Sequence, residues 1–480
     1  MIDSLDKIKG LRVTVMGLGL NGGGLASARF FAKHGAVVTV TDMKSEKDLE
    51  ESVLQLKEYP SIRFVLGRHD VKDFESADLV IKNPAVKRAG NVYLDAAKHI
   101  ESDVSVFLRL TDAPILAVTG SKGKSSTVSA LQYGLQGMGF RSFLGGNITI
   151  SPLDFLSETG KDTPVVLELS SWQLADLRGK KLLKPEVAVI TPVMPDHQNW
   201  YGSMEAYVAD KKLLYADQTP EEFCFCNYDD QWGKIFASET AAQVFWYSIK
   251  PLPENLCGAW LDKSGEVFFR LHAQAEPLRL LPNEIMVPGS ILKENVMNAA
   301  AAIFLFVRKQ RGSFADTALS DLELAAKLSA VMKTYPGLEH RLEFFYEQGG
   351  VRFYNDTTAT VPEATAAALD AFTEKPVLIC GGTDKKLDFT PIAKAAGKAK
   401  EIFLLAGTGT DLLAPLLEKK NIAYRGPFAN LDDLLICVKD CVQAGDRVVF
   451  SPGATSFGMF QNEFDRGRQF KIKVQQIFTT

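Results

Sequence analysis

The stretch ILAVTGSKGKSST, Ile115–Thr127, decides the fold of this 480-residue chain. It begins as an apolar strand and runs into Gly120 and Gly123, where the backbone can curl so that consecutive N–H groups face one anion. Lys124 adds a point charge, and Ser125 adds a hydroxyl that suits Mg²⁺. The residues that follow have helical spacing, so a phosphate would lie at a helix N-terminus. The loop is shorter than the ordinary P-loop.

The length of the chain exceeds what one hydrophobic core supports, and it predicts three domains, 1–109, 110–335 and 336–480. Each of the three parts alternates strand and helix patterns, which is typical of α/β folds. We therefore expect three mainly parallel, Rossmann-like sheets, each flanked by helices.

Composition excludes several kinds of protein. A net charge of -4 argues against nucleic acid as a partner. The first residues, 1–9, are charged and lack an apolar signal region. The longest apolar run, Ala299–Val307, is too short to cross a bilayer. We expect a cytoplasmic protein, without membrane contact, that acts as a monomer.

A second glycine cluster lies near the N-terminus. Gly17, Gly19 and Gly22 have the spacing of the dinucleotide fingerprint, and Asp42 follows roughly twenty residues later. The physics requires only a diphosphate on a helix N-terminus and a hydroxyl-bearing ring near the acid. An NAD-dependent oxidoreductase and a protein that binds a uridine diphosphate sugar both satisfy it.

Polar residues also follow the strands of the middle part. Glu168 lies inside an apolar run and needs a partner or a metal. His197 comes after the next strand, beside Asp196. Loops after the carboxyl ends of parallel strands hold ligands, so Ser125, Glu168 and His197 could converge on one Mg²⁺–phosphate site. The alternative is that Asp196 caps a helix and His197 is solvated.

The last part offers four polar loops: GLEHR with Arg341, NDTTAT with Asp356 and Thr360, GGTDKKLDF with Lys385, and SPGATSFGMFQNEF with Ser456. An arginine here suits a phosphate. An aspartate can accept hydrogen bonds from a ribose or an adenine amine. The lysine and the two hydroxyls could hold a small dicarboxylate. Ordinary turns after strands are the alternative reading of each loop.

These motifs together resemble the Mur ligase family over essentially the whole chain. The phosphate loop, LELSSWQL, DHxxxYGSMEAYxxxK, NVMN at Asn295–Asn298, and the HR, NDxxAT and SPGATSF motifs occur in the order of that family. The resemblance implies one domain for a UDP-sugar, one for ATP, and one that binds an amino acid.

The resemblance also implies the reaction, in which D-glutamate is added to UDP-N-acetylmuramoyl-L-alanine through an acyl phosphate, with ATP and Mg²⁺ as cofactors, during peptidoglycan precursor synthesis. The Asp-Asn-Pro-Arg signature of the members that add diaminopimelate or lysine does not occur in the sequence. That favours the D-glutamate step.

By motif position, the resemblance assigns site residues. Those implied to be catalytic are Lys124, His197 and Lys211. ATP contacts are implied at Gly120, Gly123, Lys124, Ser125, Ser126, Asn298, Arg341 and Asp356. The implied metal set is Ser125, Glu168, His197 and a carbamylated Lys211. The UDP-sugar would meet Leu20, Asn21, Asp42, Lys44, Asn147, Ser170 and Gln173. D-Glutamate would meet Thr360, Lys385, Ser456 and Phe464.

Several positions depart from the pattern of the family. Lys122 replaces an asparagine and Ser126 a threonine in the phosphate loop, and Thr358 replaces a lysine. Asn83–Ala85 (NPA) replaces Ser-Pro-Gly. These changes leave a second alternative open, a relative that binds nucleotide but does not catalyse ligation.

Overall fold

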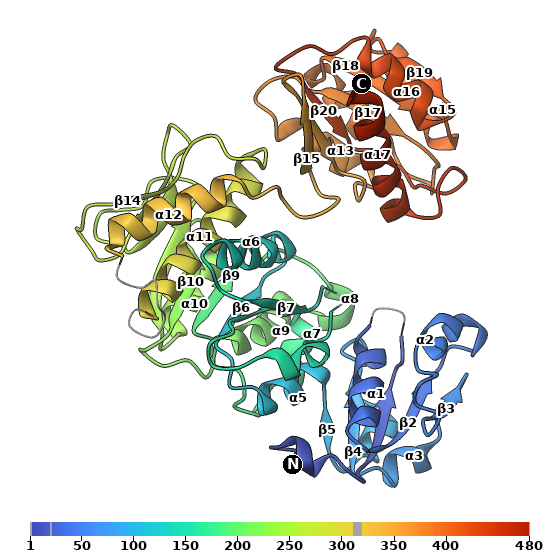
Figure 1. The fold of residues 1–480 in the computed structure, drawn as a ribbon, viewed down its shortest axis with the longest axis vertical. Helices are drawn as coiled ribbons and strands as arrows, with labels where there is room; N and C mark the ends of the chain where they lie inside the picture. The colour runs from blue at the N-terminus through green and yellow to red at the C-terminus, as the bar shows by residue number, and fades with distance from the viewer. Residues whose placement is uncertain (1, 20–21, 149, 311–318, 480) are drawn as a thin grey trace. The chain divides into compact units, whose positions relative to one another are not determined.

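The computed structural model describes residues 2–19, 22–148, 150–310 and 319–479. It contains three β-sheets, which Figure 1 draws in blue, in cyan to yellow, and in orange to red along the chain. Leu20 and Asn21, two of the residues expected to meet a UDP-sugar, lie outside the described residues.

The first sheet is parallel throughout and has the strand order β3-β2-β1-β4-β5. In its central strand, β1, the last four residues are all buried, as is typical of a parallel strand with both faces of the sheet covered. The strands are β1 (Arg12–Met16), β2 (Val37–Asp42), β3 (Arg63–Leu66), β4 (Leu79–Lys82) and β5 (Ile100–Glu101).

The second sheet has the order β14-β13-β12-β11-β10-β9-β6-β8-β7. The pairs from β7 to β12 are parallel, and β12 and β13 are antiparallel. The strands are β6 (Ile115–Thr119), β7 (Phe143–Gly146), β8 (Val165–Glu168), β9 (Val187–Ile190), β10 (Phe223–Asn227), β11 (Gln243–Ser248), β12 (Gly258–Leu261), β13 (Val267–Arg270) and β14 (Leu278–Leu281).

The third sheet has the order β15-β16-β20-β17-β18-β19, antiparallel only between β15 and β16. Val377 and Ile379 belong to one apolar cluster and Leu378 and Cys380 to another, so both faces of β17 are buried. The strands are β15 (Glu343–Gln348), β16 (Val351–Asn355), β17 (Val377–Gly381), β18 (Glu401–Leu405), β19 (Arg425–Phe428) and β20 (Arg447–Phe450).

α-Helices alternate with the strands along the chain. They are α1 (Gly23–Lys33), α2 (Glu50–Leu54), α3 (Val71–Glu75), α4 (Val92–Asp95), α5 (Asp103–Leu110), α6 (Lys124–Gly137), α7 (Ser171–Asp176), α8 (Gln198–Tyr201), α9 (Met204–Lys211), α10 (Gln231–Glu239), α11 (Ser290–Lys309), α12 (Asp321–Lys333), α13 (Pro362–Asp370), α14 (Thr390–Ala395), α15 (Thr408–Glu418), α16 (Leu431–Lys439) and α17 (Glu463–Phe478). Short 3₁₀ helices are η1 (Leu5–Lys7), η2 (Lys47–Leu49), η3 (Pro152–Asp154), η4 (Leu156–Glu158), η5 (Lys212–Leu214) and η6 (Ala396–Lys398).

The expected fold class is confirmed: three mainly parallel sheets are flanked by helices. The chain divides into two compact units, residues 1–280 with 297–329, and residues 281–296 with 330–480. Residues 281–296, which the sequence placed in the middle domain, therefore group with the third sheet. The three domain boundaries stay a prediction.

Helix α11 is long and apolar enough to cross a membrane by length and composition alone. Within its most apolar window, 78% of the residues are buried inside the protein. Burial of that extent is typical of a core helix, which passes the same test of length and hydropathy.

A buried arginine joins two loops at the third sheet. Arg466 in α17 is 1% exposed, and its guanidinium donates to the hydroxyl and the carbonyl of Thr357 and to the carbonyl of Ala454. Burial lowers the pKa of Arg466 to about 10, so the group stays charged at neutral pH. The loops after β16 and β20 are therefore held together by one side chain.

We expect Arg466→Ala to lower the free energy of unfolding by about 3 kcal/mol, because it leaves buried acceptors without donors. Urea unfolding followed by circular dichroism measures this change. Arg468→Ala is the matched control, because the Arg468 side chain is exposed and makes a long ion pair, with 3.9 Å between its guanidinium and the carboxylate of Asp465. Equal effects in the two variants contradict the role given to Arg466.

Candidate functional site

The phosphate loop begins where the buried strand β6 ends. Gly120 has φ +146°, and a Cβ there would lie 1.9 Å from Oγ1 of Thr191, so only glycine fits. Gly123, with φ +87°, caps α6, whose first residue is Lys124 and whose second is Ser125. The glycine loop therefore leads directly into the N-terminus of α6, the strand–loop–helix order that the sequence predicts.

Two lysine ammonium groups converge on one carbonyl oxygen of this loop. Nζ of Lys124 lies 3.0 Å from the carbonyl oxygen of Gly120, and Nζ of Lys211 lies 2.8 Å from the same atom. The Lys211 side chain also packs over the ring of Tyr207, 4.4 Å from its centroid. Lys211 thus comes from α9 to the phosphate loop, a placement that motif position implied and spacing alone did not.

Lys211 and Lys212 differ in their surroundings. Lys211 is 1% exposed, and burial together with the nearby Lys124 lowers its pKa to about 7. Lys212 lies on the surface, where it pairs with Glu239 at 2.6 Å. Carbamylation requires a neutral amine, so the environment of Lys211 suits that reaction.

Glu168 ends β8, which pairs with β6 through Val118. Its Oε1 accepts a hydrogen bond from Nδ2 of Asn147 at 2.9 Å. Its Oε2 is buried and has no hydrogen-bond partner among the described residues. A buried carboxylate oxygen without a donor is costly, so this position fits a cation.

His197 follows β9 and takes a left-handed conformation, with φ +50°, at the start of α8. Its ring lies 4.8 Å from that of Trp172 and 6.2 Å from that of Tyr207, between centroids. The side chain is 43% exposed, and Nε2 lies 3.7 Å from Oδ2 of Asp196. The aromatic neighbours fix the place of the ring, and sequence reasoning had not identified them.

The side chains at this site have the chemistry of a magnesium-binding set. Ser125, Glu168, His197 and a carbamylated Lys211 offer oxygen ligands and one imidazole, and oxygen is what Mg²⁺ prefers. The orphaned oxygen of Glu168 supports such an ion. The Tyr207 ring contacts both Lys211 and His197, and its hydroxyl lies 3.1 Å from Oγ of Ser121 in the phosphate loop. The residues fit the group.

A cavity of about 430 Å³ lies between residues of the first and second sheets. Four of the residues expected to meet a UDP-sugar line it, namely Lys44, Asn147, Ser170 and Gln173. Ser170 and Gln173 also form a capping box at the start of α7, two residues after β8 ends at Glu168. The divergent Asn83–Ala85 loop lines the same cavity, as does the buried Asp103, which the sequence had not singled out.

Asp42 does not line this cavity. Its carboxylate accepts hydrogen bonds from the N–H of Gly19 at 3.1 Å and from that of Lys44 at 2.9 Å. In this conformation Asp42 orders the glycine turn itself. Its expected contact with a ligand hydroxyl stays a prediction.

Asp356 follows β16 and accepts hydrogen bonds from Oγ of Ser451 at 2.7 Å and from the N–H of Leu342 at 3.1 Å. Burial raises its pKa to about 7. Arg341, beside Leu342, is exposed. Thr358, the divergent position, donates to the carbonyl of His340 at 2.8 Å. Hydrogen bonds thus join the HR and NDxxAT loops.

The residues expected to meet D-glutamate are not gathered into one cavity described at the third sheet. Ser456 is buried beside a space of only about 10 Å³. Lys385 is exposed, Phe464 is 48% exposed, and Thr360 is half-buried. Their shared role stays a prediction.

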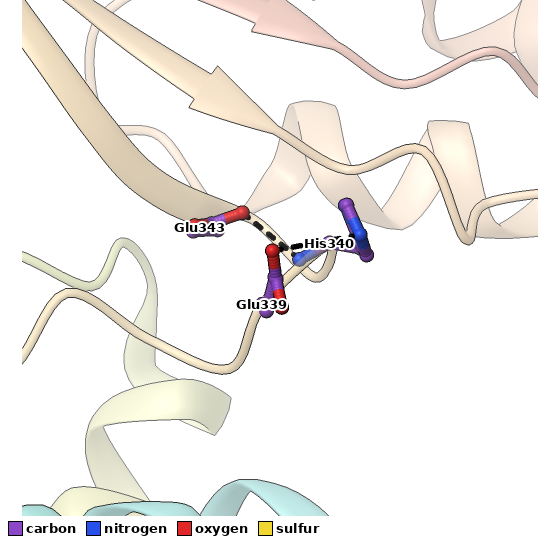
Figure 2. Close-up of side chains that lie close together, drawn as sticks. All are labelled: Glu339, His340 and Glu343. Atoms are coloured by element: carbon purple, nitrogen blue, oxygen red, sulfur yellow. Dashed lines mark hydrogen bonds and ion pairs between the residues drawn. The ribbon is translucent and has the colours of Figure 1, made fainter. Parts of the chain in front are cut away.

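Glu339, His340 and Glu343 lie at the start of β15 and in the loop before it, with ligand atoms within 4.8 Å of one another (Figure 2). Lys471 pairs with Glu343 at 2.6 Å and with Glu339 at 3.3 Å. Glu343 also accepts from the N–H of His340, and Nδ1 of His340 meets Nδ2 of Asn355. Because protein donors already occupy these groups, they form a structural network rather than a metal site.

Asn298 in α11 is 0% exposed, and neither its amide oxygen nor its nitrogen has a hydrogen-bond partner among the described residues. Leaving such atoms unpaired costs about 1–3 kcal/mol each. An asparagine of this kind is consistent with a polar ligand, and its nucleotide contact stays a prediction.

Three family models match the chain. The Mur ligase MurD-like N-terminal domain matches residues 11–105, the Mur ligase middle domain residues 118–306, and the Mur ligase glutamate ligase domain residues 340–453. Each match covers most of one of the three sheets.

Relatives with similar sequences share one name, "UDP-N-acetylmuramoylalanine--D-glutamate ligase". The protein of Treponema pallidum (strain Nichols) is 46% identical, over 98% of each chain. That of Borreliella afzelii (strain PKo) is 39% identical, over 98% of this chain and 99% of its own.

Solved structures show the fold at lower identity. The alanine ligase MurC of Thermotoga maritima matches with a TM-score of 0.55 at 18% identity, over 97% of this chain and 99% of its own. MurF of Acinetobacter baumannii matches with a TM-score of 0.56 at 13% identity, over 97% and 94%.

Proposed function

The chain belongs to the Mur ligase family, and from that premise we propose that it joins D-glutamate to UDP-N-acetylmuramoyl-L-alanine at the expense of ATP. The observation that carries the proposal is the 46% identity, over 98% of each chain, to the Treponema relative with that name. We further propose that the protein acts in the cytoplasm as a monomer, without nucleic acid or membrane as a partner.

The reaction must activate a free carboxylate, because forming a peptide bond from one is uphill in water. The γ-phosphoryl group of ATP passes to the carboxylate of the L-alanyl end, which gives ADP and an acyl phosphate. The amine of D-glutamate attacks the acyl carbon, loses a proton, and expels phosphate. The product is UDP-N-acetylmuramoyl-L-alanyl-D-glutamate.

Positioning and charge neutralisation carry most of such catalysis. In the proposed site the first N–H groups of α6 and the ammonium of Lys124 hold the phosphates of ATP. Ser125 and Glu168 would hold one Mg²⁺, and His197 and a carbamate on Lys211 would support a second. The metal supplies positive charge against the transferring phosphoryl oxygens when it is bound.

The remaining residues bind the three substrates in the same proposal. Ser126 and Gly123 complete the phosphate loop, and Asn298, Arg341 and Asp356 meet the nucleotide. The UDP-sugar occupies the cavity lined by Lys44 and Asn147. Carbamylation turns the Lys211 cation into a carboxylate-like anion, which is why a lysine can hold a metal.

Two alternative functions predict different experimental results. An oxidoreductase, supported only by the Gly17–Gly22 turn and Asp42, binds NADH rather than ATP with Mg²⁺ in isothermal titration. A non-catalytic relative binds the nucleotide but releases no phosphate. The proposal is tested by phosphate release that depends on ATP, D-glutamate and UDP-N-acetylmuramoyl-L-alanine together; release with any one omitted counts against it.

Lys124→Ala is expected to reduce turnover on the order of 10³-fold, because a charge aimed at the phosphates is lost while little packing changes. The measurement is phosphate release at saturating ATP. Lys122→Ala, in the exposed part of the same loop, is the matched control and keeps near wild-type turnover. An active Lys124→Ala enzyme overturns the assignment.

Lys211→Ala is expected to be nearly inactive, and acetate is expected to restore part of the activity by occupying the vacated anion position. Lys212→Ala is expected to behave like the wild type, because that side chain pairs with Glu239 on the surface. Phosphate release with increasing acetate measures both. Rescue of Lys212→Ala instead, or no loss in either variant, contradicts the proposed carbamate.

Lys385→Ala is expected to raise the KM for D-glutamate about tenfold while changing the KM for ATP little, because the ammonium group that pairs with one carboxylate of the substrate is lost. Lys386→Ala, its exposed neighbour, serves as the control. A parallel rise in both KM values would assign Lys385 to the nucleotide or to domain closure.

A further inference from the structure

A buried lysine ends the strand that leads into the divergent Asn83–Ala85 loop. Lys82 is 4% exposed at the carboxyl end of β4, although a lysine at a strand end is ordinarily solvated. Its ammonium donates to the carbonyl of Asn83 at 3.1 Å, of Pro84 at 3.4 Å and of Val86 at 3.0 Å. One cation therefore holds most of the carbonyls of this turn.

The same ammonium lies 2.9 Å from Oδ2 of Asp176, the last residue of α7. No hydrogen-bond donor is oriented at this oxygen among the described residues, so charge attraction joins the two groups. Burying an ion pair is costly, and removing one partner leaves the other charge in a poor environment. Lys82 and Asp176 thus depend on each other.

The two segments that this pair joins line one cavity. Asn83, Pro84 and Ala85 form one wall of the 430 Å³ cavity, and Trp172 and Gln173 of α7 form part of another. Asn83 also contacts the first glycine turn, where a Cβ on Gly17 would lie 3.0 Å from its own Cβ. A shift of the Asn83–Ala85 loop relative to α7 would change the width of the cavity.

We propose that Lys82 and Asp176 are positioning residues that hold the Asn83–Ala85 loop and α7 at the spacing required by the sugar nucleotide. This inference rests on the proposed function, because it takes the cavity as the UDP-sugar site. Neither side chain lines that cavity, so the pair acts through the loop and the helix rather than by contact with substrate.

Charged groups from several elements surround Asp176. Its carboxylate faces Lys82 from β4, Lys180 from the segment after α7, and Asp103 from α5. The charged residues that line the neighbouring cavity of about 380 Å³ with them are Lys87, Arg88, Glu101, Arg178 and Asp210. Burial is the largest influence and raises the pKa of Asp176 to about 6. The carboxylate is therefore charged above pH 6 and is progressively neutralised as the pH falls below it.

The first experiment compares Lys82→Met and Asp176→Asn with the wild type at pH 7.5. We expect the KM for UDP-N-acetylmuramoyl-L-alanine to rise about tenfold. The kcat and the KM values for ATP and D-glutamate should change less than twofold, because misplacing this loop and helix weakens the binding of one substrate only. Lys180→Met is the matched control. Lys180, in the segment after α7, also reaches the first sheet, where its ammonium contacts Glu101 and the carbonyl of Ile100, but it makes no hydrogen bond to the Asn83–Ala85 loop among those described.

The second experiment measures the wild type itself, so its main result does not depend on the folding of a variant. Isothermal titration with UDP-N-acetylmuramoyl-L-alanine between pH 5 and 8 should show weaker binding by the wild type as the pH falls through about 6. Asp176→Asn, which keeps the shape of the side chain, should bind weakly with a flat profile. The control Lys180→Met should stay pH-dependent, with its midpoint moved to higher pH, because the cation that favours the charged Asp176 carboxylate is lost.

Three results overturn the inference: unchanged sugar-nucleotide affinity in both variants, equal loss for all three substrates, or a wild-type binding profile that stays flat through pH 6. Failure of the proposed function has a different signature. In that case the wild type releases no phosphate with the three substrates, or its titration with UDP-N-acetylmuramoyl-L-alanine gives no binding heat at pH 7.5, whatever the variants do.

Discussion

The carbonyl oxygen of Gly120 receives two ammonium groups, and the rest of the site depends on that convergence. Two cations at one atom repel each other, and burial makes the repulsion stronger. Burial is the largest cause of the lowered pKa of Lys211, and repulsion from Lys124 adds to it. A lysine with a pKa near 7 has a neutral amine that can add to CO₂ and release a proton, which gives a carbamate, and the pair would then be one cation and one anion. The phosphate loop thus sets the chemistry of a residue that lies ninety positions away.

Sheet topology explains why residues so far apart in sequence meet. β6 lies between β8 and β9, so the phosphate loop, Glu168 and the loop that leads to His197 leave neighbouring strands at one edge. Parallel pairing places all three carboxyl ends on the same side of the sheet. The aromatic rings of Trp172 and Tyr207 then fill the space between them.

Local patterns predicted the phosphate loop, the glycine turn and the alternation of strands and helices, because each depends on residues close in sequence. Lys211 is buried against Tyr207 and Gly120. Tyr207 lies four residues earlier on the same helix, α9, so a local pattern can reveal it, whereas Gly120 is distant in the sequence. Lys82 had none, since its partner Asp176 lies on another sheet's helix. Asp42 matched its fingerprint, yet its carboxylate orders the turn itself. Long-range partners decide such positions, and a single sequence does not display them.

The hydrogen bonds of the Arg466 guanidinium to two loops have a consequence for how the sequence can change over time. Its planar guanidinium reaches acceptors on two separate loops, at Thr357 and Ala454, and a lysine cannot reproduce that geometry. A lineage that loses this arginine must rebuild both loops in the same interval or accept a less stable protein. Position 466 and the two loops should therefore vary together among descendants, although Thr357 lies 109 residues and Ala454 only 12 residues from Arg466 in the sequence.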